Sequence, residues 1–397
     1  MFGFLRQSLA LSTANLRSLP RRAWISLSMV LSVTLVVLVL LGFLAMANGF
    51  RKTLSSTGAD NVALVLSRGA FSEALSRIET QQAHLVEEAP GLVRTDDGTP
   101  LISRELVVPV DAVALDSNKN ETLSLRGIDQ TGLTLRPRVQ ISDGRMMTPG
   151  TAEIVVGARL ASRYRNLAVG DTITFGRSQW TVVGHFTAGG SVFESELLAD
   201  AGLVQAQFNR PNQIQSLRVQ LSDAARFEQF RAYVEDELDM GLAAQTEKAF
   251  YAAQASDISR IILFLGWPLA IVMAFGAAVG AMTTMYSSVS DRMIEIATVR
   301  ALGFSRSAAF VATLVEALVL TLIGCAIGVA LAWIGLDGWS ASTKGGANAQ
   351  LAFQLALSWP QAVSAVVLAL AIGAVGGGLP ALRATRVPLR AAMTGRA

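Results

Sequence analysis

Four long stretches of this chain consist mainly of apolar residues and carry almost no charge. They cover 23–50, 261–290, 307–336 and 345–382, and the one charged side chain among them is Glu316 in the third. About 20 apolar residues are enough to cross the hydrocarbon core of a membrane, and a single helix can do so because it satisfies its own backbone polar groups. The pattern therefore predicts four spanning helices, with a large polar segment between the first and the second.

The order of the expected segments follows from these stretches and from the charges beside them. They are an amphipathic helix (1–22), a spanning helix (23–50), an external domain (51–257), a second spanning helix (258–288), a short loop helix (289–306), a third spanning helix (307–336), a loop (337–358), a fourth spanning helix (359–382) and a tail (383–397). The first segment is read as an interfacial helix because one helical face gathers its large apolar residues, Phe2, Leu5, Leu9 and Leu16. A plain continuation of the first span is the alternative.

The polar segment reads as a mixed α/β domain. Alternating residues at 107–115 and 121–128 predict two paired strands around a turn-forming cluster at 117–120. Further strands are expected at 152–156, 171–175, 179–186 and 215–221, and helices at 71–88, 158–165, 224–238 and 243–260. We interpret the domain as two subdomains, a βαβ-type unit made of 52–138 and 213–250 and a β-rich insertion at 139–212. The fold class is thus membrane α-helical, four spans arranged one plus three, with a large external α+β domain.

Composition supports a membrane protein and makes nucleic acid a poor candidate partner. Hydrophobic residues make up 51% of the 397 positions and charged residues only 16%, which is too apolar for an ordinary soluble domain. The sequence pI of about 9.3 reflects arginines placed beside the spans and not a basic face with interleaved aromatic residues. Cys325 is the only cysteine and lies within the third span, so the external domain has no disulfide.

Arginines beside the spans also predict the orientation of the chain. They gather before the first span, in the 289–306 loop and after the fourth span, whereas the 337–358 loop contains Lys344 alone. Because cytoplasmic loops carry the excess of Lys and Arg, both termini and the 289–306 loop are expected in the cytoplasm, and the large domain on the opposite side of the membrane. A cleaved signal peptide at 45–47 is the alternative for the N-terminus, but its apolar core would be too long.

No catalytic, metal or cofactor site is evident from the residues. None of the four lysines follows the glycine-rich loop that cradles phosphates, so no nucleotide site is expected in this chain. His84 and His185 stand apart from other ligand residues and read as structural. Glu194 and Glu196 flank a glycine-rich loop, and we interpret them as solvated or as contacts for a partner.

Four strings of residues, in this order on this topology, resemble the type VII ABC-transporter permeases of the MacB/FtsX group, which includes MacB, LolC/LolE and DevC. The first is the one-plus-three layout itself. The second is Gly144-Arg145 followed by EIVVG (153–157), VGDTI (169–173) and WTVVG (180–184); the third is RMIEIATVRALG (292–303); the fourth is Glu316 with Gly324, Gly328 and the ending GLPALRA (378–384). The resemblance covers essentially the whole chain.

The resemblance implies a coupling helix in the 289–306 loop that docks on an ATPase. The residues carried over to it are Arg292, Ile294, Glu295, Ala297, Arg300, Ala301 and Gly303. The pattern places Ile294, Ala297, Ala301 and Phe304 on one helical face, lets Arg292 pair with Glu295, and puts Gly303 where the helix ends. On composition alone, an interfacial helix with snorkelling arginines is the alternative. Transmembrane packing or a dimer interface is expected at Gly276, Gly280, Glu316, Gly324, Gly328 and Pro380.

The family also implies partners, and it leaves two functions open. The expected partners are a cytoplasmic ABC ATPase dimer that binds ATP and Mg, a second copy of this permease or a related one, membrane lipid and, in export systems, a periplasmic adaptor and an outer-membrane channel. The leading hypothesis is a permease subunit that drives export or extraction of a substrate from the periplasm or outer leaflet. The alternative is an FtsX-like regulatory module that controls a periplasmic partner such as a cell-wall hydrolase. A neighbouring gene for an adaptor would favour the first, and one for a hydrolase the second.

The charge pattern generates a labelling prediction. In a Cys325→Ala background, a cysteine in place of Ser117 should react with an impermeant maleimide in cells whose outer membrane is permeabilised, because 117 lies in the external domain. A cysteine in place of Ser305 should react only after detergent opens the inner membrane. Labelling of both sites, or of neither, in cells with an intact inner membrane contradicts this topology.

Overall fold

A computed structural model describes residues 2–19, 23–344 and 350–386. These residues form two compact units. The helical unit comprises the described residues of 1–49, 259–339 and 355–397, and the sheet unit comprises those of 50–258 and 340–354. The helical unit matches the predicted bundle of spans, and the sheet unit matches the predicted α/β domain. The sheet unit also includes residues 340–354, which come from the loop between the last two spans.

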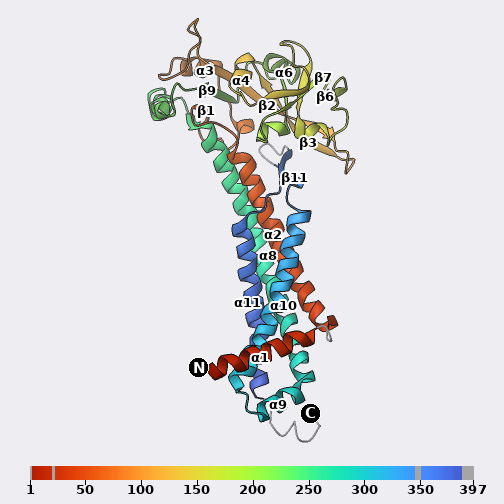
Figure 1. The fold of residues 1–397 in the computed structure, drawn as a ribbon. Helices are drawn as coiled ribbons and strands as arrows, with labels where there is room; N and C mark the ends of the chain where they lie inside the picture. Colours follow the sequence, from red (N-terminus) through yellow and green to blue (C-terminus); the bar gives the residue numbers. More distant parts are fainter. Residues whose placement is uncertain (1, 20–22, 345–349, 387–397) are drawn as a thin grey trace. The chain divides into compact units, whose positions relative to one another are not determined.

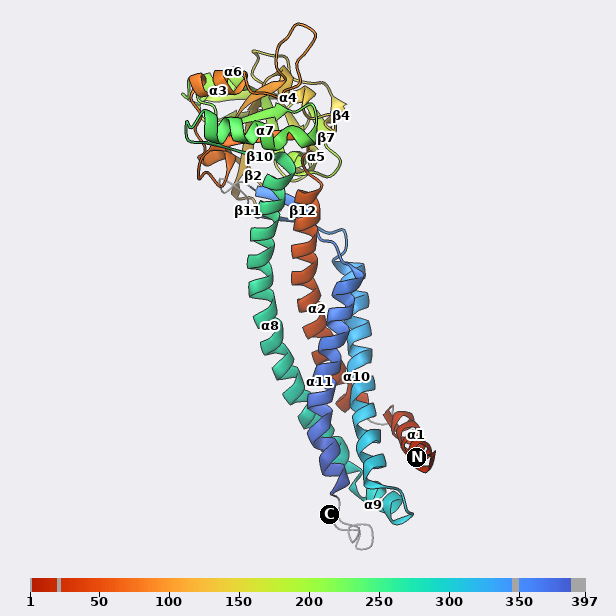
Figure 2. The same ribbon diagram turned by 90° about the vertical axis from the view of Figure 1, so that its left-hand side faces the viewer.

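Four helices are long and apolar enough to cross a membrane, as the sequence predicted. They are α2 (Ala23–Ser55), α8 (Glu247–Asp291), α10 (Arg306–Gly335) and α11 (Trp359–Thr385). At about 1.5 Å per residue, the 45-residue α8 exceeds the thickness of the hydrocarbon core, and its first turns belong to the sheet unit. Figures 1 and 2 show α1 (Phe2–Ser18) and α9 (Met293–Ala301) at the same end of the helical unit.

Close approach of α10 to α2 depends on two of the predicted glycines. A Cβ atom on Gly324 would lie 2.7 Å from the Val30 carbonyl oxygen, and one on Gly328 would lie 2.8 Å from Val37 Cγ1. The Thr34 hydroxyl of α2 donates a hydrogen bond of 3.0 Å to the Gly324 carbonyl oxygen. The absence of side chains at these two positions thus lets the helix backbones approach within the chain.

Other glycines of the spans divide into two groups by whether they contact a neighbouring helix. Gly373 and Gly377 of α11 lie against Thr321 and Ala317 of α10, and Gly376 lies against Ala281 of α8. No atom within 4 Å would meet a Cβ on Gly276 or Gly280. A side chain at either position would therefore meet no other helix of the described chain, and a role in a dimer interface stays a prediction. Pro380 lies inside α11 and is buried.

The sheet unit is built on one ten-stranded mixed sheet. Its strand order is β10-β1-β9-β2-β3-β8-β5-β7-β4, with β6 paired to β7. The strands are β1 (Val62–Ser67), β2 (Ile102–Val113), β3 (Asn120–Ile128), β4 (Gln140–Gly144), β5 (Glu153–Gly157), β6 (Thr172–Phe175), β7 (Ser178–Thr187), β8 (Glu196–Asp200), β9 (Ser216–Gln220) and β10 (Leu242–Thr246). Pairing of β3 with β8 and of β5 with β7 is parallel, and all other pairs are antiparallel.

Short helices cover the apolar side chains of this sheet in two cores. One core lies over β1, β9 and β10 beneath α3 (Thr80–Val86) and α7 (Phe227–Ala232), and the other lies over β2, β3, β5, β7 and β8 with α5 (Ala158–Ala161) and α6 (Ala201–Gln207). The remaining elements are α4 (Gln130–Thr134), the short 3-10 helices η2 (Glu73–Leu75), η3 (Val192–Ser195) and η4 (Ala224–Arg226), the π-helix η5 (Tyr233–Glu237) that follows α7, and the hairpin of β11 (Ser340–Lys344) and β12 (Gln350–Gln354). The sheet continues across residue 138, and the division into two subdomains stays a prediction.

Three predicted helices are shorter than their patterns suggested. Most of 71–79 is not helical, because Ser76 and Ile78 bond to Ser67 and Ile214 of the sheet region. The helix expected at 158–165 ends at Ala161, since Tyr164 forms a bridge with Ala114. The helix expected from 243 begins only at Glu247, because 242–246 pairs with β1. In each case a pairing between distant segments replaced a locally helical pattern.

The glycines of the bundle generate a paired prediction. Gly328→Ala should lower the melting temperature of the purified protein in detergent, because overpacking costs about 1–3 kcal/mol. Gly280→Ala should leave it unchanged or raise it slightly, since Ala favours a helix by up to about 1 kcal/mol over Gly. Equal melting temperatures of the two variants would contradict the packing described above.

Candidate functional site

The residues expected to contact an ATPase form a short, well-defined helix. The helix α9 has nine residues and lies between α8 and α10 in the chain. Gly303 follows with a φ of +99°, a left-handed conformation that favours glycine, and so ends the helix where the sequence predicted. The Ser305 hydroxyl then accepts a hydrogen bond from the Ala308 N–H and caps α10. Two local signals therefore fix both the end of α9 and the start of the next helix.

Arg292 anchors the start of α9 through three side chains. Its Nη1 lies 3.2 Å from Glu316 Oε2 of α10, its Nε lies 3.2 Å from Glu295 Oε2, and its Nη2 donates to Asn15 Oδ1 of α1 at 2.5 Å. Arg292 and Glu316 are both buried. A buried charge is tolerated when it is paired and hydrogen-bonded, so Glu316 belongs to an ion pair that joins α9 to the bundle.

The apolar residues of α9 that were predicted to share one docking face differ in their exposure to solvent. Ala297 is fully buried within the chain, and Phe304 is partly buried. Ile294 is 45% exposed and Leu302 is 76% exposed, and Thr298 and Ala301 are exposed beside them. Ala297 is therefore unavailable for docking, because α9 needs it to pack on the bundle. The exposed apolar strip of α9 is Ile294, Ala301 and Leu302.

A cavity of about 130 Å³ lies beside this anchor. Its lining comes from α1, α8, α9 and α10 and is mostly apolar, with Arg292, Glu295, Arg300 and Glu316 among the lining residues. Arg300 is partly buried and lines this cavity. Glu295, in contrast, is exposed.

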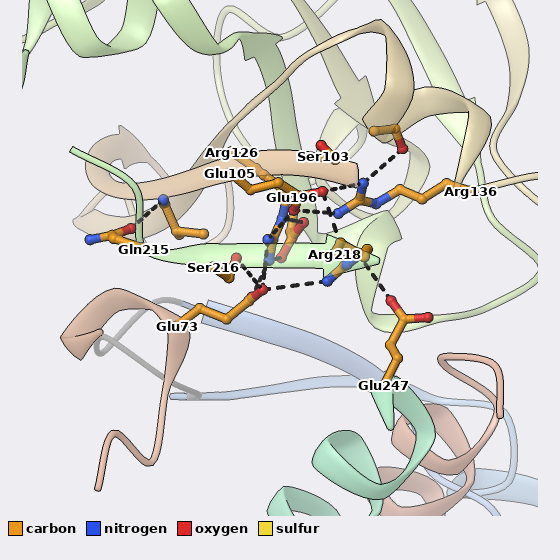
Figure 3. A network of polar contacts seen from close by, with 12 residues as sticks. Glu73, Ser103, Glu105, Arg126, Arg136, Glu196, Gln215, Ser216, Arg218 and Glu247 are labelled. Atoms are coloured by element: carbon orange, nitrogen blue, oxygen red, sulfur yellow. Dashed lines mark hydrogen bonds and ion pairs between the residues drawn. The ribbon is translucent and has the colours of Figure 1, made fainter. Parts of the chain in front are cut away.

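A second group of charged residues is buried in the centre of the sheet unit (Figure 3). The guanidinium of Arg126 on β3 contacts Glu73, Glu105 and Glu196 at 2.6–3.1 Å. Arg136 donates two hydrogen bonds to Glu105, at 2.6 and 2.7 Å. Arg218 on β9 lies 3.0 Å from Glu247 and 3.4 Å from Glu73. We call these seven residues the buried ionic network.

The buried ionic network joins elements that are distant in the sequence. Glu105, Arg126, Glu196 and Arg218 come from four neighbouring strands, Glu73 comes from η2, and Glu247 is the first residue of α8. Glu247 also accepts a hydrogen bond of 3.2 Å from the Ala59 N–H, just after α2. The network therefore fixes the ends of α2 and α8 nearest the sheet to the strands at its centre.

The arginines favour the ionised form of two carboxylates of the network, Glu105 and Glu73. Burial alone would raise the pKa of Glu105, but Arg136, Arg218 and Arg126 outweigh it and hold that pKa well below its ordinary value. Burial likewise opposes ionisation of Glu73, yet Arg126 and Arg218 lower its pKa. The guanidiniums of Arg136 and Arg218 also lie over the Phe193 ring, at 4.9 and 5.2 Å from its centroid.

This network was not predicted from the sequence, because its residues occupy the polar positions of strands with alternating polar and apolar residues. Such positions normally face solvent. On β9, Ser216 and Arg218 alternate with the apolar Leu217 and Val219, which normally predicts a half-exposed strand. The structure buries both faces. The available signal was the opposite charge of Glu105, Arg126 and Arg218 on neighbouring strands, which becomes visible only when the strand order is known.

Two smaller interpretations also need correction. Glu194 is not solvated: it is buried, accepts hydrogen bonds of 2.8 Å from the N–H groups of Ala188 and Gly190, and lies 3.3 Å from Arg159. Glu196 is likewise buried, within the network. His84 and His185 contact Glu87 and the Leu167 carbonyl, and no group of three metal-ligating side chains occurs in the described part of the chain.

The network generates a stability prediction with a defined pH dependence. Glu105→Gln should lower the stability of the sheet unit at neutral pH, because removing one partner of a buried ion pair costs about 3–5 kcal/mol. The folded pKa of Glu105 lies below its unfolded value of about 4.3. Its contribution is therefore complete above that value and is lost as the pH falls toward the folded pKa.

Thermal unfolding of the purified protein, followed at several pH values, tests this. The gap in melting temperature between wild type and Glu105→Gln should be large at pH 7 and should narrow below about pH 4.3. Asp60→Asn is the matched control, because it removes an exposed ion pair with Lys248, worth about 0–1 kcal/mol. A Glu105→Gln variant as stable as the control would mean that the network does not stabilise the fold.

Comparison with known families covers both units. A family profile described as the MacB-like periplasmic core domain matches residues 26–237, and one described as the FtsX-like permease C-terminal matches residues 268–389. Two solved structures resemble the sheet unit: the periplasmic region of MacB from Actinobacillus actinomycetemcomitans (TM-score 0.36, 14% identity, 48% of this chain and 90% of that one) and the extracellular domain of YknZ from Gram-positive bacteria (TM-score 0.35, 15% identity, 47% and 99%).

Curated relatives match parts of the chain. Escherichia coli MacB, a macrolide export ATP-binding/permease protein, is 34% identical over 110 residues, which are 28% of this chain and 16% of MacB. The ABC transporter permease YvrN of Bacillus subtilis is 28% identical over 189 residues, 45% of this chain and 44% of YvrN. The matches thus span less than half of either relative. Together with the two family profiles, they place the chain in the MacB/FtsX group of ABC-transporter permeases.

Proposed function

We propose that this permease couples ATP hydrolysis by a separate ABC ATPase to a conformational change of its periplasmic domain. In this proposal α9 is the coupling helix, and ATP and Mg are bound by the partner. The single observation that carries the proposal is the combination of an exposed apolar strip on α9 with a buried anchor at its start. Ile294 and Leu302 are exposed, whereas Arg292 is held by Glu316.

This arrangement suits the transmission of force. The exposed strip can be buried in a groove of the ATPase, which favours binding through the hydrophobic effect. The anchor makes the motion of α9 a motion of α10 as well, because the Arg292–Glu316 ion pair cannot open without leaving two buried charges unpaired. In this proposal the ATP-binding residues belong to the partner, and α9 supplies the surface that meets it.

In the sheet unit, the buried ionic network is the corresponding attachment for the start of α8 and the end of α2. Glu247 opens α8 and pairs with Arg218 at 3.0 Å, and Ala59, just after α2, bonds to Glu247. A shift of these helix ends would be passed to the central strands, because each ion is paired with residues of several elements. We propose that the resulting change of the periplasmic domain drives export or extraction of a substrate from the periplasm or outer leaflet.

The assembly that we propose follows from the family. The permease acts in the inner membrane with both termini in the cytoplasm, as a pair of identical or related permeases beside an ATPase dimer. Gly276 and Gly280, which contact no other described residue closely, supply a small-residue surface that suits the second permease. A periplasmic adaptor and an outer-membrane channel complete the proposed export system.

A substitution on the exposed strip tests the proposal. Ile294→Asp should abolish co-purification of the ATPase that accompanies the tagged wild-type chain from native membranes, because a charge would be buried unpaired in the groove. The permease-dependent ATPase rate should be lost with it. Thr298→Ala should retain the complex.

Leu115→Asp is the matched control, since it places the same charge on an exposed apolar position of the sheet unit. It should leave the complex and its ATPase rate intact. If Ile294→Asp keeps both the partner and the rate while the protein remains folded, α9 is not the coupling helix.

A further inference from the structure

The inner side of α1 is bonded to both ends of α9. The side-chain oxygen of Asn15 accepts a hydrogen bond from Arg292, the residue just before α9, at 2.5 Å. The side-chain oxygen of Gln7 accepts one from the N–H of Ser305, just beyond Gly303, at 3.2 Å. Any displacement of α1 is thus communicated to α9 at both of its ends.

The outer side of α1 combines an apolar strip with a basic one. Leu5 is 58% exposed and Leu9 is 69% exposed. Arg6 and Arg17 are exposed beside them on the same side of the helix. The helix contains no acidic residue, and among the described residues none forms an ion pair with either arginine. Both guanidiniums are therefore available to an anionic partner.

The chain itself confines α1 to the neighbourhood of a membrane surface. Only residues 19–22 separate Ser18, where α1 ends, from Ala23, where the spanning helix α2 begins. Five residue steps extend at most about 17 Å. Trp24, at the start of α2, is 85% exposed, and tryptophan is enriched at the membrane–water interface. The apolar strip of α1 thus lies within reach of lipid, and its arginines lie within reach of lipid phosphates.

We propose that α1 binds an anionic lipid surface and that this binding sets the position of α9. Leu5 and Leu9 insert at the interface, Arg6 and Arg17 contact the phosphates, and Asn15 and Gln7 hold α9. The inference rests on the proposed function of α9 as the coupling helix and adds a regulator to it. Anionic lipid is thereby a condition for efficient coupling, because it fixes α1 and so the two ends of α9.

The packing around Asn15 allows such control. The cavity of about 130 Å³ separates part of α1 from the bundle and is lined by Leu11, Ala14 and Asn15 of α1. A helix that is closely packed along its whole inner face could not be moved by contacts on its outer face, because protein interiors resist deformation. α1 packs along α10, but next to Asn15 an open volume adjoins the polar contact with Arg292. At this end of α1, contacts on the outer face can therefore influence where the helix rests.

The experiment uses the full chain with its co-purified ATPase in nanodiscs of phosphatidylcholine, with or without phosphatidylglycerol. An environment-sensitive fluorophore on Ala10→Cys, in a Cys325→Ala background, reports contact of α1 with lipid. The ATPase rate reports coupling. For the wild type, phosphatidylglycerol should shift the fluorophore emission to the blue and raise the permease-dependent rate.

Three variants separate lipid contact from transmission. The double variant Arg6→Gln, Arg17→Gln should show no emission shift, because two arginines no longer contact the anionic surface. In this variant the increase in ATPase rate caused by phosphatidylglycerol should be smaller than in the wild type by a factor of at least about three. Asn15→Ala should keep the shift but lose the gain. Thr13→Ala, exposed on the same helix, should behave as the wild type.

The outcomes distinguish this inference from the proposed function. If the wild-type chain stimulates its ATPase equally in both lipids, or if phosphatidylglycerol causes no emission shift, the inference is wrong and the coupling function stands. If the chain stimulates no ATPase in either lipid, the coupling function fails, and the emission shift alone then decides whether α1 binds anionic lipid. A shift that survives loss of both arginines also overturns the proposed contact.

Discussion

Charged side chains away from water must be paired, and this constraint governs the parts of both units that matter for function. In the helical unit the guanidinium of Arg292 and the carboxylate of Glu316 are buried together. In the sheet unit, Arg126, Arg136 and Arg218 are each paired with buried carboxylates. Because an unpaired member would carry the full cost of a desolvated charge, each group restricts the elements that supply it to one arrangement.

Such pairing gives short elements a position that they could not hold by themselves. A helix of nine residues, such as α9, is too short to be stable in water without tertiary contacts. The buried Arg292 fixes its first turn, Ala297 packs it against the bundle, and Gly303 ends it. The apolar residues that remain exposed on α9 are therefore held on a defined surface and not on a flexible loop.

The spanning helices depend on a different device, the removal of side-chain volume. Gly324 and Gly328 let α10 approach the backbone of α2, and Gly373 and Gly377 let α11 approach α10. Lipid offers no hydrophobic drive between helices, so close van der Waals contact and interhelical hydrogen bonds, such as that from Thr34 to Gly324, hold the bundle.

The sequence by itself determined the four spans, the large α/β domain between the first and second, the family, and the position of α9 with its ending at Gly303. These features depend on local hydrophobic periodicity, span length and turn-forming residues, and each of these is determined by residues that are close together in the sequence. Part of the candidate site also follows from the sequence, since the string at 292–303 contains Arg292 and Glu295, and Glu316 is the one charge within the spans. The exposed strip does not, because the pattern of α9 cannot say that Ala297 packs inward while Leu302 faces outward.

Only the tertiary structure decided which polar residues are buried and which glycines touch a neighbouring helix. Alternating residues on β2, β3 and β9 predict one polar face, but whether that face meets water depends on the strand order and on η2, η3 and α8 covering it. Likewise Gly276 and Gly328 look alike in sequence, and only the arrangement of helices separates them. The physical reason is the same in both cases. Whether a residue is buried depends on which distant segment packs against it, and the local sequence specifies only one of the two segments in each contact.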